Sequence, residues 1–146
     1  MKLNIALLAA AATSALHVKN LAGEPMYNDE ERKLPVRIHL HGPGSDAAGI
    51  VESRQTARAL KRMADNDGKV TAATPEERRA DTAADLTTLT SHFENFPFTP
   101  EGADAPLTGD ALCQAIYGNP AFGYITRQVT KHFGDWGNFN AASNAA

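Results

Sequence analysis

The sequence has one cysteine, one tryptophan and no long hydrophobic run. Cys113 cannot form an internal disulfide, so we interpret it as a small buried thiol and the compartment as a reducing one. The apolar run at 5–12 is too short to cross a bilayer. The formal net charge of −3 gives no excess of basic residues, and such an excess would mark a general affinity for nucleic acid. We therefore expect neither a membrane nor a nucleic acid as partner.

The composition is that of one folded domain. With 146 residues, of which 42% are hydrophobic and 21% charged, the chain can bury one modest core and is not disordered throughout. We divide it into an apolar leader at 1–15, which is helical or mobile, a single α+β domain at 16–139, and a flexible tail at 140–146. Within the domain we expect strands in 16–44 and helices in 45–139.

The first residues resemble a secretory signal. Lys2 precedes an apolar run, and small residues follow that run. However, only one lysine precedes the run, which is short and rich in alanine, so a simple helix or a mobile leader explains it as well. We therefore expect the cytoplasm, and keep export as the alternative.

The best strand candidate is Val36–Leu40, where apolar residues occupy every second position. Leu16–Lys19 also alternates, and Pro25–Tyr27 is a further extended piece. These segments predict a small N-terminal antiparallel hairpin or sheet, which needs a helix over its apolar face to be stable.

The remainder predicts a bundle of about four short helices. The first begins at a cap on Ser45 or Asp46 and ends near Asn66; the second has Thr74 as cap with Glu77 closing a capping box, and ends at 95. Their apolar faces are expected to be Ile50, Val51, Ala57, Leu60, Met63 and Ala64 in the first, and Ala83, Leu86, Leu89, Thr90 and Phe93 in the second.

Two further short helices are expected within 105–139, joined at Gly118-Asn119-Pro120. The side chain of Thr108 is expected to cap the first of them. The second carries an apolar stripe that continues into an aromatic end, and aromatic residues are frequent anchors at protein interfaces. We interpret this stripe either as core or as a surface for a protein partner. Its residues are Phe122, Ile125, Val129, Phe133, Trp136 and Phe139.

Three short segments are candidate chemical sites. His39 and His41 share a strand face, which suits two metal ligands, but spacing places no third, and a polar strand face explains them better; the candidates for a third are Asp46, His17 and His92. Gly42-Pro43-Gly44-Ser45 precedes a helix and could hold an anion, yet it lacks the Walker pattern, and a simple connection is the better interpretation. His41-Gly42-Pro43-Gly44 resembles the oxyanion loop of lipase-like hydrolases, but the sequence has no Gly-x-Ser-x-Gly turn to carry the serine, so we reject that class.

Charged residues cluster on the first two helices. Arg54, Arg58, Lys61 and Arg62 form either a phosphate-binding patch or, as we prefer, a solvated flank balanced by Glu52, Asp65 and Asp67 of the same helix. Glu76, Glu77 and Asp81 are explained by the positive end of the second helix. We therefore predict no catalytic residue, no metal, no cofactor and no enzyme activity.

Taken in order, these features resemble those of the small tail assembly chaperones of long-tailed bacteriophages and prophages. No single motif is specific; the order, from about 16 to 139, carries the resemblance. The chain departs from the family pattern at two places. At 93 or 96 it has phenylalanine where many members have tryptophan, and at Gly137 it has glycine where the family has arginine. The matching features are Gly23-Glu24-Pro25, Val36–Leu40, Gly44-Ser45-Asp46, Arg54–Arg62, Phe93 or Phe96, Phe98-Thr99-Pro100, Ala111-Leu112, Asn119-Pro120-Ala121-Phe122, Gln128-Val129 and Asn138-Phe139.

The resemblance implies a protein that is not an enzyme. Such chaperones bind the tape-measure protein, keep it soluble in the host cytoplasm, help to recruit the major tail protein and leave before the tail is complete. Many relatives also have a longer form made by translational frameshift. A homo-oligomer is compatible with this role. The alternatives are a structural minor tail or tube-associated virion protein, and an exported bacterial protein of unknown role.

Overall fold

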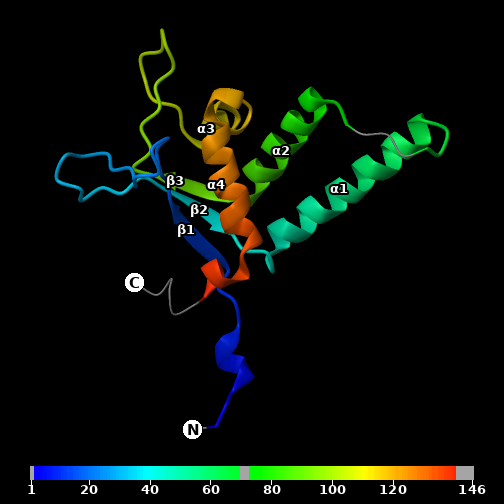
Figure 1. The fold of residues 1–146 in the computed structure, drawn as a ribbon, viewed down its shortest axis with the longest axis horizontal. Helices are drawn as coiled ribbons and strands as arrows, with labels where there is room; N and C mark the ends of the chain where they lie inside the picture. The colour runs from blue at the N-terminus through cyan, green and yellow to red at the C-terminus, as the bar shows by residue number, and fades with distance from the viewer. Residues whose placement is uncertain (1, 70–72, 141–146) are drawn as a thin grey trace.

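The computed structural model describes residues 2–69 and 73–140, which form a three-stranded antiparallel sheet with four α-helices (Figure 1). The chain has the predicted small α+β fold. The elements, in chain order, are η1 (Ile5–Leu8), β1 (Thr13–His17), β2 (Arg37–His41), α1 (Asp46–Asp65), α2 (Pro75–Leu89), β3 (Thr90–Glu94), α3 (Gly109–Tyr117), η2 (Pro120–Phe122), α4 (Gly123–Gly134) and η3 (Trp136–Phe139), where η marks a 3-10 helix.

The central strand of the sheet is β2, which pairs antiparallel with β1 and with β3. Ile38 and Leu40 of β2 are fully buried, and the residues that alternate with them, Arg37, His39 and His41, are half-buried, as the sequence pattern predicts. Ile38 lies opposite Leu16 of β1 and Phe93 of β3. Strand β1 begins at Thr13 rather than at 16, so the last residues of the expected leader belong to the sheet.

The prediction that 90–95 continue the second helix was wrong. Helix α2 ends at Leu89, and Thr90–Glu94 form β3, so one strand lies within the part of the chain that was expected to be helical. The hydroxyl of Thr90 donates to the Leu86 carbonyl and contacts the hydroxyl of Tyr117. β-branched residues lose side-chain freedom in a helix, and the free edge of β2 offers backbone partners, so the strand prevails.

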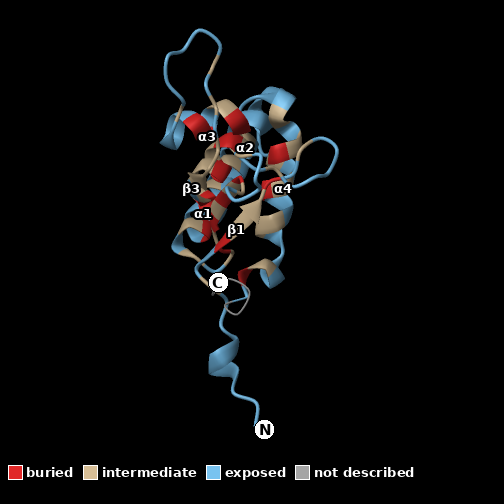
Figure 2. Ribbon diagram, turned by 90° about the vertical axis from the view of Figure 1, so that its left-hand side faces the viewer, coloured by how far each residue is buried: buried red, intermediate tan, exposed pale blue. Residues whose placement is uncertain are grey.

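The core lies between the sheet and helices α2, α3 and α4 (Figure 2). Phe139, which follows α4, is fully buried and closes this core at the end where β1 begins. The other large side chains that are almost completely buried come from both layers, and they include Val18, Ile38, Leu40, Ile116 and Val129.

The helix ends follow the predicted caps with one exception. The hydroxyl oxygen of Ser45 accepts a hydrogen bond from the Ala48 backbone N–H, and that of Thr74 accepts one from Glu77. Thr108 makes no side-chain capping hydrogen bond. Gly109, the first residue of α3, has a φ of 58°, so the chain enters this helix through a left-handed residue and the usual capping geometry is lost.

Helix α1 contributes little to the core. Only Ala48 and Val51 of α1 are buried, whereas Ile50 and Leu60 keep 56% and 62% of their surface exposed. The predicted inner face of this helix was therefore wrong for most of its residues. The helix extends beyond the sheet with α2 beside it (Figure 1), so most of its turns have no sheet to pack against.

The two ends of the described chain meet at the sheet. Ala10 and Asn140 form an antiparallel bridge, and the Ala11 N–H donates to the Phe139 carbonyl at 2.6 Å. Asn140 is thus paired, contrary to its assignment to a flexible tail, while 141–146 lie outside the described residues. No helix within 2–69 and 73–140 combines the length and the apolar character that a membrane span requires.

Candidate partner-binding surface

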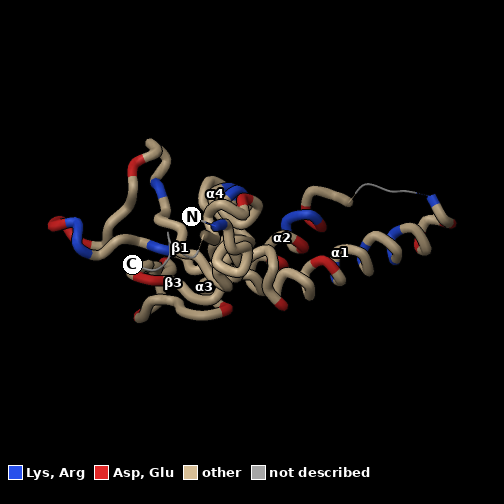
Figure 3. Tube along the Cα trace, turned by 90° about the horizontal axis from the view of Figure 1, so that it is seen from below, with Lys and Arg blue, Asp and Glu red and all other residues tan. Residues whose placement is uncertain are grey.

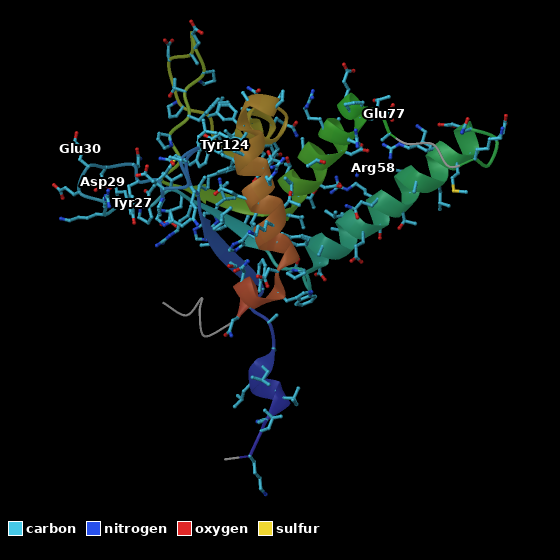
Figure 4. The ribbon with its side chains drawn as sticks, in the orientation of Figure 1. Tyr27, Asp29, Glu30, Arg58, Glu77 and Tyr124 are labelled. Carbon is cyan, nitrogen blue, oxygen red and sulfur yellow. The ribbon has the colours of Figure 1, made fainter. Side chains whose placement is uncertain are left out.

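Ion pairs join α1 to α2. Arg54, Arg58 and Arg62 project from successive turns of α1, and Figure 4 shows Arg58 between the two helices. Arg58 Nη1 lies 2.9 Å from Asp85 Oδ2, and its Nε lies 3.4 Å from Asp81 Oδ1. The further contacts are Arg62 with Asp81 and Glu77, and Arg54 with the Thr88 hydroxyl.

These contacts correct both interpretations of the basic cluster. The arginines are neither a phosphate-binding patch nor a flank balanced by acids of their own helix, because their partners are on α2. Likewise, Glu77 and Asp81 do not only lie near the positive end of α2, because their carboxylates also pair with arginines of α1. Basic positions recur along α1, and α2 carries acidic positions (Figure 3). The hydrogen bond to Asp85 raises the pKa of Arg58 above its ordinary value, so the guanidinium stays protonated.

A groove lies between α1, α2 and the end of α4. We call it the α1–α4 groove. Its wall is mostly apolar, and its only charged residues are Glu52 and Asp85. The residues that line it are Pro43, Ala48, Val51, Glu52, Gln55, Thr82, Asp85, Leu86, Leu89, Thr130, Phe133 and Trp136.

Trp136 is the large exposed side chain of this groove. It is 58% exposed, and its ring lies against Gly44, where an added Cβ would be 3.4 Å from the indole. Deeper in the groove, Asp85 is buried, and its Oδ1 atom has no hydrogen-bond partner among the described residues. The groove therefore combines an aromatic rim with carboxylates and carries no lysine or arginine.

The structure separates the six residues of the predicted aromatic stripe. Ile125, Val129 and Phe139 belong to the core and are at most 2% exposed, although Ile125 also lines the second groove described below. Phe133 is half-buried and lines the α1–α4 groove with Trp136. Phe122 is half-buried in a second, uncharged groove, which it shares with Met26, Tyr27, Phe98 and Tyr124 among others. Of the six, only Phe122, Phe133 and Trp136 are accessible to a partner in this conformation.

Sequence reasoning missed another apolar surface, the segment before β1. Leu3, Ile5, Leu7 and Leu8 are each between 65% and 78% exposed. The sequence did offer a signal: the apolar run has neither helical nor strand periodicity, so it lacks a single apolar face that could pack against the domain.

The expected polar face of β2 is present, and His39 and His41 share it. His39 Nε2 lies 2.7 Å from Glu94 Oε1, and the His39 ring stacks on His92 at 4.1 Å between centroids. The hydrogen bond from His39 lowers the pKa of Glu94, while burial and then the charge of His39 lower the pKa of His92. Across the described chain, no three His, Cys, Asp or Glu side chains are arranged to hold a metal ion.

Gly42-Pro43-Gly44-Ser45 connects β2 to α1. The Gly42 N–H donates to the Ala12 carbonyl at 2.8 Å, and the Ser45 N–H donates to the Gly42 carbonyl, so these two donors are already used. Cys113 is buried as predicted, and burial raises the pKa of its thiol. Neither the Gly42–Ser45 connection nor Cys113 brings a nucleophile and a base together.

Comparison of the chain with protein-family models, with curated protein sequences and with solved structures gives no match.

Proposed function

We propose that this chain is an assembly factor that binds another polypeptide, and that it acts as a phage tail assembly chaperone. In this role it binds the tape-measure protein in the host cytoplasm, helps to recruit the major tail protein, and is absent from the finished tail. The proposal rests on the resemblance in the order of sequence features. A structural observation supports it, namely the exposed Trp136 at the rim of the apolar α1–α4 groove.

The chemistry of the groove favours a peptide segment as ligand. An exposed tryptophan supplies a large rigid contact area at little entropic cost, and it is a frequent hot-spot residue. Phe133 extends the apolar wall inward, and Glu52 borders it with a carboxylate. Such a groove suits one face of an amphipathic helix, with apolar residues against the wall and a basic residue near Glu52.

Co-expression with the tape-measure protein encoded in the same genome tests this proposal. The wild-type chain is expected to co-purify with that protein and to keep it soluble, and Trp136→Ala is expected to reduce both effects. Leu21→Ala is the matched control, because Leu21 is a large exposed side chain outside the groove and should tolerate the change. Co-purification that Trp136→Ala leaves unchanged would remove the groove from the proposal.

The alternatives give different outcomes. A minor tail or tube-associated protein would remain in mature tails at stoichiometric amounts, whereas a chaperone would be absent from them. An exported bacterial protein would lose its first dozen or so residues, which intact-mass measurement after expression detects. Either result contradicts the chaperone proposal.

A further inference from the structure

Within residues 2–69 and 73–140, no part of the chain covers the large apolar side chains of the segment before β1. We call residues 2–9 the N-terminal arm. Its four large apolar residues are mostly exposed, and the arm extends away from the domain (Figures 1 and 2). Clustered apolar side chains that face water mark a contact surface, since their burial is favourable.

The base of the arm is fixed in direction. Ala11 and Ala12 are hydrogen-bonded to Phe139 and Gly42 respectively, and Ala10 bridges Asn140. From this base, which lies near the Pro43 end of the groove, the arm runs away from the domain, whereas α1 and α2 run in a different direction (Figure 1). To reach the groove of its own chain, the arm would have to reverse its direction directly next to these pairings. A second molecule can receive the arm in its observed direction, without such a reversal.

The α1–α4 groove matches the arm in chemistry. The arm is apolar and its only charged side chain is Lys2, whereas the groove is apolar and its only charged side chains are Glu52 and Asp85. The arm consists of the 3-10 helix η1 with residues 2–4 before it and Ala9 after it, which are not helical, so it reaches roughly 20 Å.

The position of the groove makes the exchange mutual. Pro43 lines the groove and directly follows Gly42, which is hydrogen-bonded to the arm's base. Each molecule thus presents an arm and a groove at the same end. A two-fold axis between two copies places each arm near the other groove, and every contact then occurs twice.

We propose that two copies of this chain exchange their N-terminal arms. Ile5, Leu7 and Leu8 of each arm lie in the α1–α4 groove of the other copy, and Lys2 lies near Glu52 of that copy. This dimer concerns the free protein and does not depend on the proposed function. If the groove also binds the tape-measure protein, the arm occupies it until that protein replaces it.

Sedimentation equilibrium of the purified full chain tests the exchange. The wild type is expected to reach twice the mass of 15.6 kDa as its concentration rises. Ile5→Glu with Leu7→Glu places charge in the groove and is expected to weaken dimerisation by at least about tenfold. Leu21→Glu is the control, because it adds charge at an exposed leucine outside both arm and groove, and it should leave the dimer intact.

Trp136 gives an independent signal because it is the single tryptophan of the chain. Its fluorescence is expected to shift to the blue as the wild type dimerises and to stay red in the arm variant. A folded wild type that stays monomeric overturns the proposal, as does a dimer that the arm variant leaves unchanged. Circular dichroism on every variant separates loss of the dimer from loss of the fold.

Disulfide cross-linking then identifies the occupant. In a Cys113→Ala background, Leu7→Cys in one preparation and Thr130→Cys in another are mixed and oxidised, since Thr130 lies on the groove wall. The exchange predicts a covalent dimer that needs both variants. In the double variant Leu7→Cys/Thr130→Cys, a cross-link confined to the monomer would show that the arm occupies the groove of its own chain, and would overturn the exchange.

Discussion

Arg58 of α1 and Asp85 of α2 form a charge-assisted hydrogen bond of 2.9 Å between Nη1 and Oδ2. Asp85 keeps only 10% of its side chain exposed, and Arg58 keeps 21%. Because α1 places only Ala48 and Val51 in the core, this pair and its neighbours hold most of the helix in place. The pair also fixes one wall of the α1–α4 groove, which Asp85 lines.

Arg58→Ala is expected to lower the free energy of unfolding by about 3 kcal/mol, because it leaves the buried Asp85 carboxylate without its main partner. Urea denaturation measures this loss. Lys33→Ala is the matched control, since the Lys33–Glu31 pair is about three-quarters exposed and should change stability by less than about 1 kcal/mol. Equal losses in the two variants would show that the α1–α2 ion pairs do not anchor α1.

Gly42→Ala is expected to destabilise the domain by about 1–3 kcal/mol, because it overfills a packed site. An added Cβ would lie 3.0 Å from a ring carbon of Phe139 and 3.1 Å from the Ala11 carbonyl oxygen. Thermal unfolding gives the readout. Gly49→Ala is the control on α1, where a Cβ meets nothing within 4 Å, and it should stabilise by about 0.5–1 kcal/mol through helix propensity. A Gly42→Ala variant as stable as the wild type would mean that the packing around Gly42 accommodates the added methyl group without cost.

Stability is expected to fall as the pH drops below about 6.5. Burial lowers the pKa of His132, which lies 2.9 Å from the Ser14 hydroxyl; Asp135 opposes this shift without cancelling it. The unfolded chain therefore binds a proton on this histidine more readily than the folded chain does. The stabilisation is complete well above the unfolded pKa and is lost as the pH falls through it toward the folded pKa. His92, whose pKa is also lowered, acts in the same direction.

Urea midpoints at about pH 7.5 and about pH 5.5 measure this dependence. In His132→Gln, which cannot bind the proton, the difference between the two midpoints is expected to shrink. If the two midpoints of His132→Gln differ as much as those of the wild type, His132 is excluded as a main source of the pH dependence of stability.

Tyr117→Phe is expected to cost about 1 kcal/mol, because it removes a buried hydroxyl hydrogen bond. The Tyr117 and Thr90 oxygens lie 2.7 Å apart, at the point where α2 gives way to β3. Tyr27→Phe, on a side chain that is 36% exposed, should change stability by less than about 0.5 kcal/mol. Chemical denaturation of both variants makes the comparison. A Tyr117→Phe variant as stable as the wild type would show that this hydroxyl pair adds nothing at the junction.

Local patterns predicted the elements whose signals lie within a few residues. The alternation around Ile38 and Leu40 gave the central strand, and the caps at Ser45 and Thr74 gave the starts of two helices. Phe133 and Trp136 were among the predicted partner-binding residues, and they meet at one groove. Their membership of one aromatic stripe was visible in the sequence, but the groove was not, because α1 and α2 supply its other wall.

The stripe itself shows the limit of periodicity. Val129 and Phe133 lie one turn apart on the same helix, yet the first is fully buried and the second is half-exposed at the groove. Helical spacing says which residues share a face, and it does not say where the facing layer ends. Val129 belongs to the core, whereas Phe133 lines the α1–α4 groove, whose other wall comes from α1 and α2.

The sequence by itself determined the α+β class, the central strand, the helix starts and the burial of Cys113, because each depends on local periodicity, capping or side-chain polarity. Only the tertiary structure decided that Thr90–Glu94 join the sheet, that the arginines of α1 pair with acids of α2, and that the N-terminal arm projects into water. Those three outcomes depend on residues far apart in the chain. A free strand edge, an opposing charge or an apolar face becomes available only when the fold brings it near.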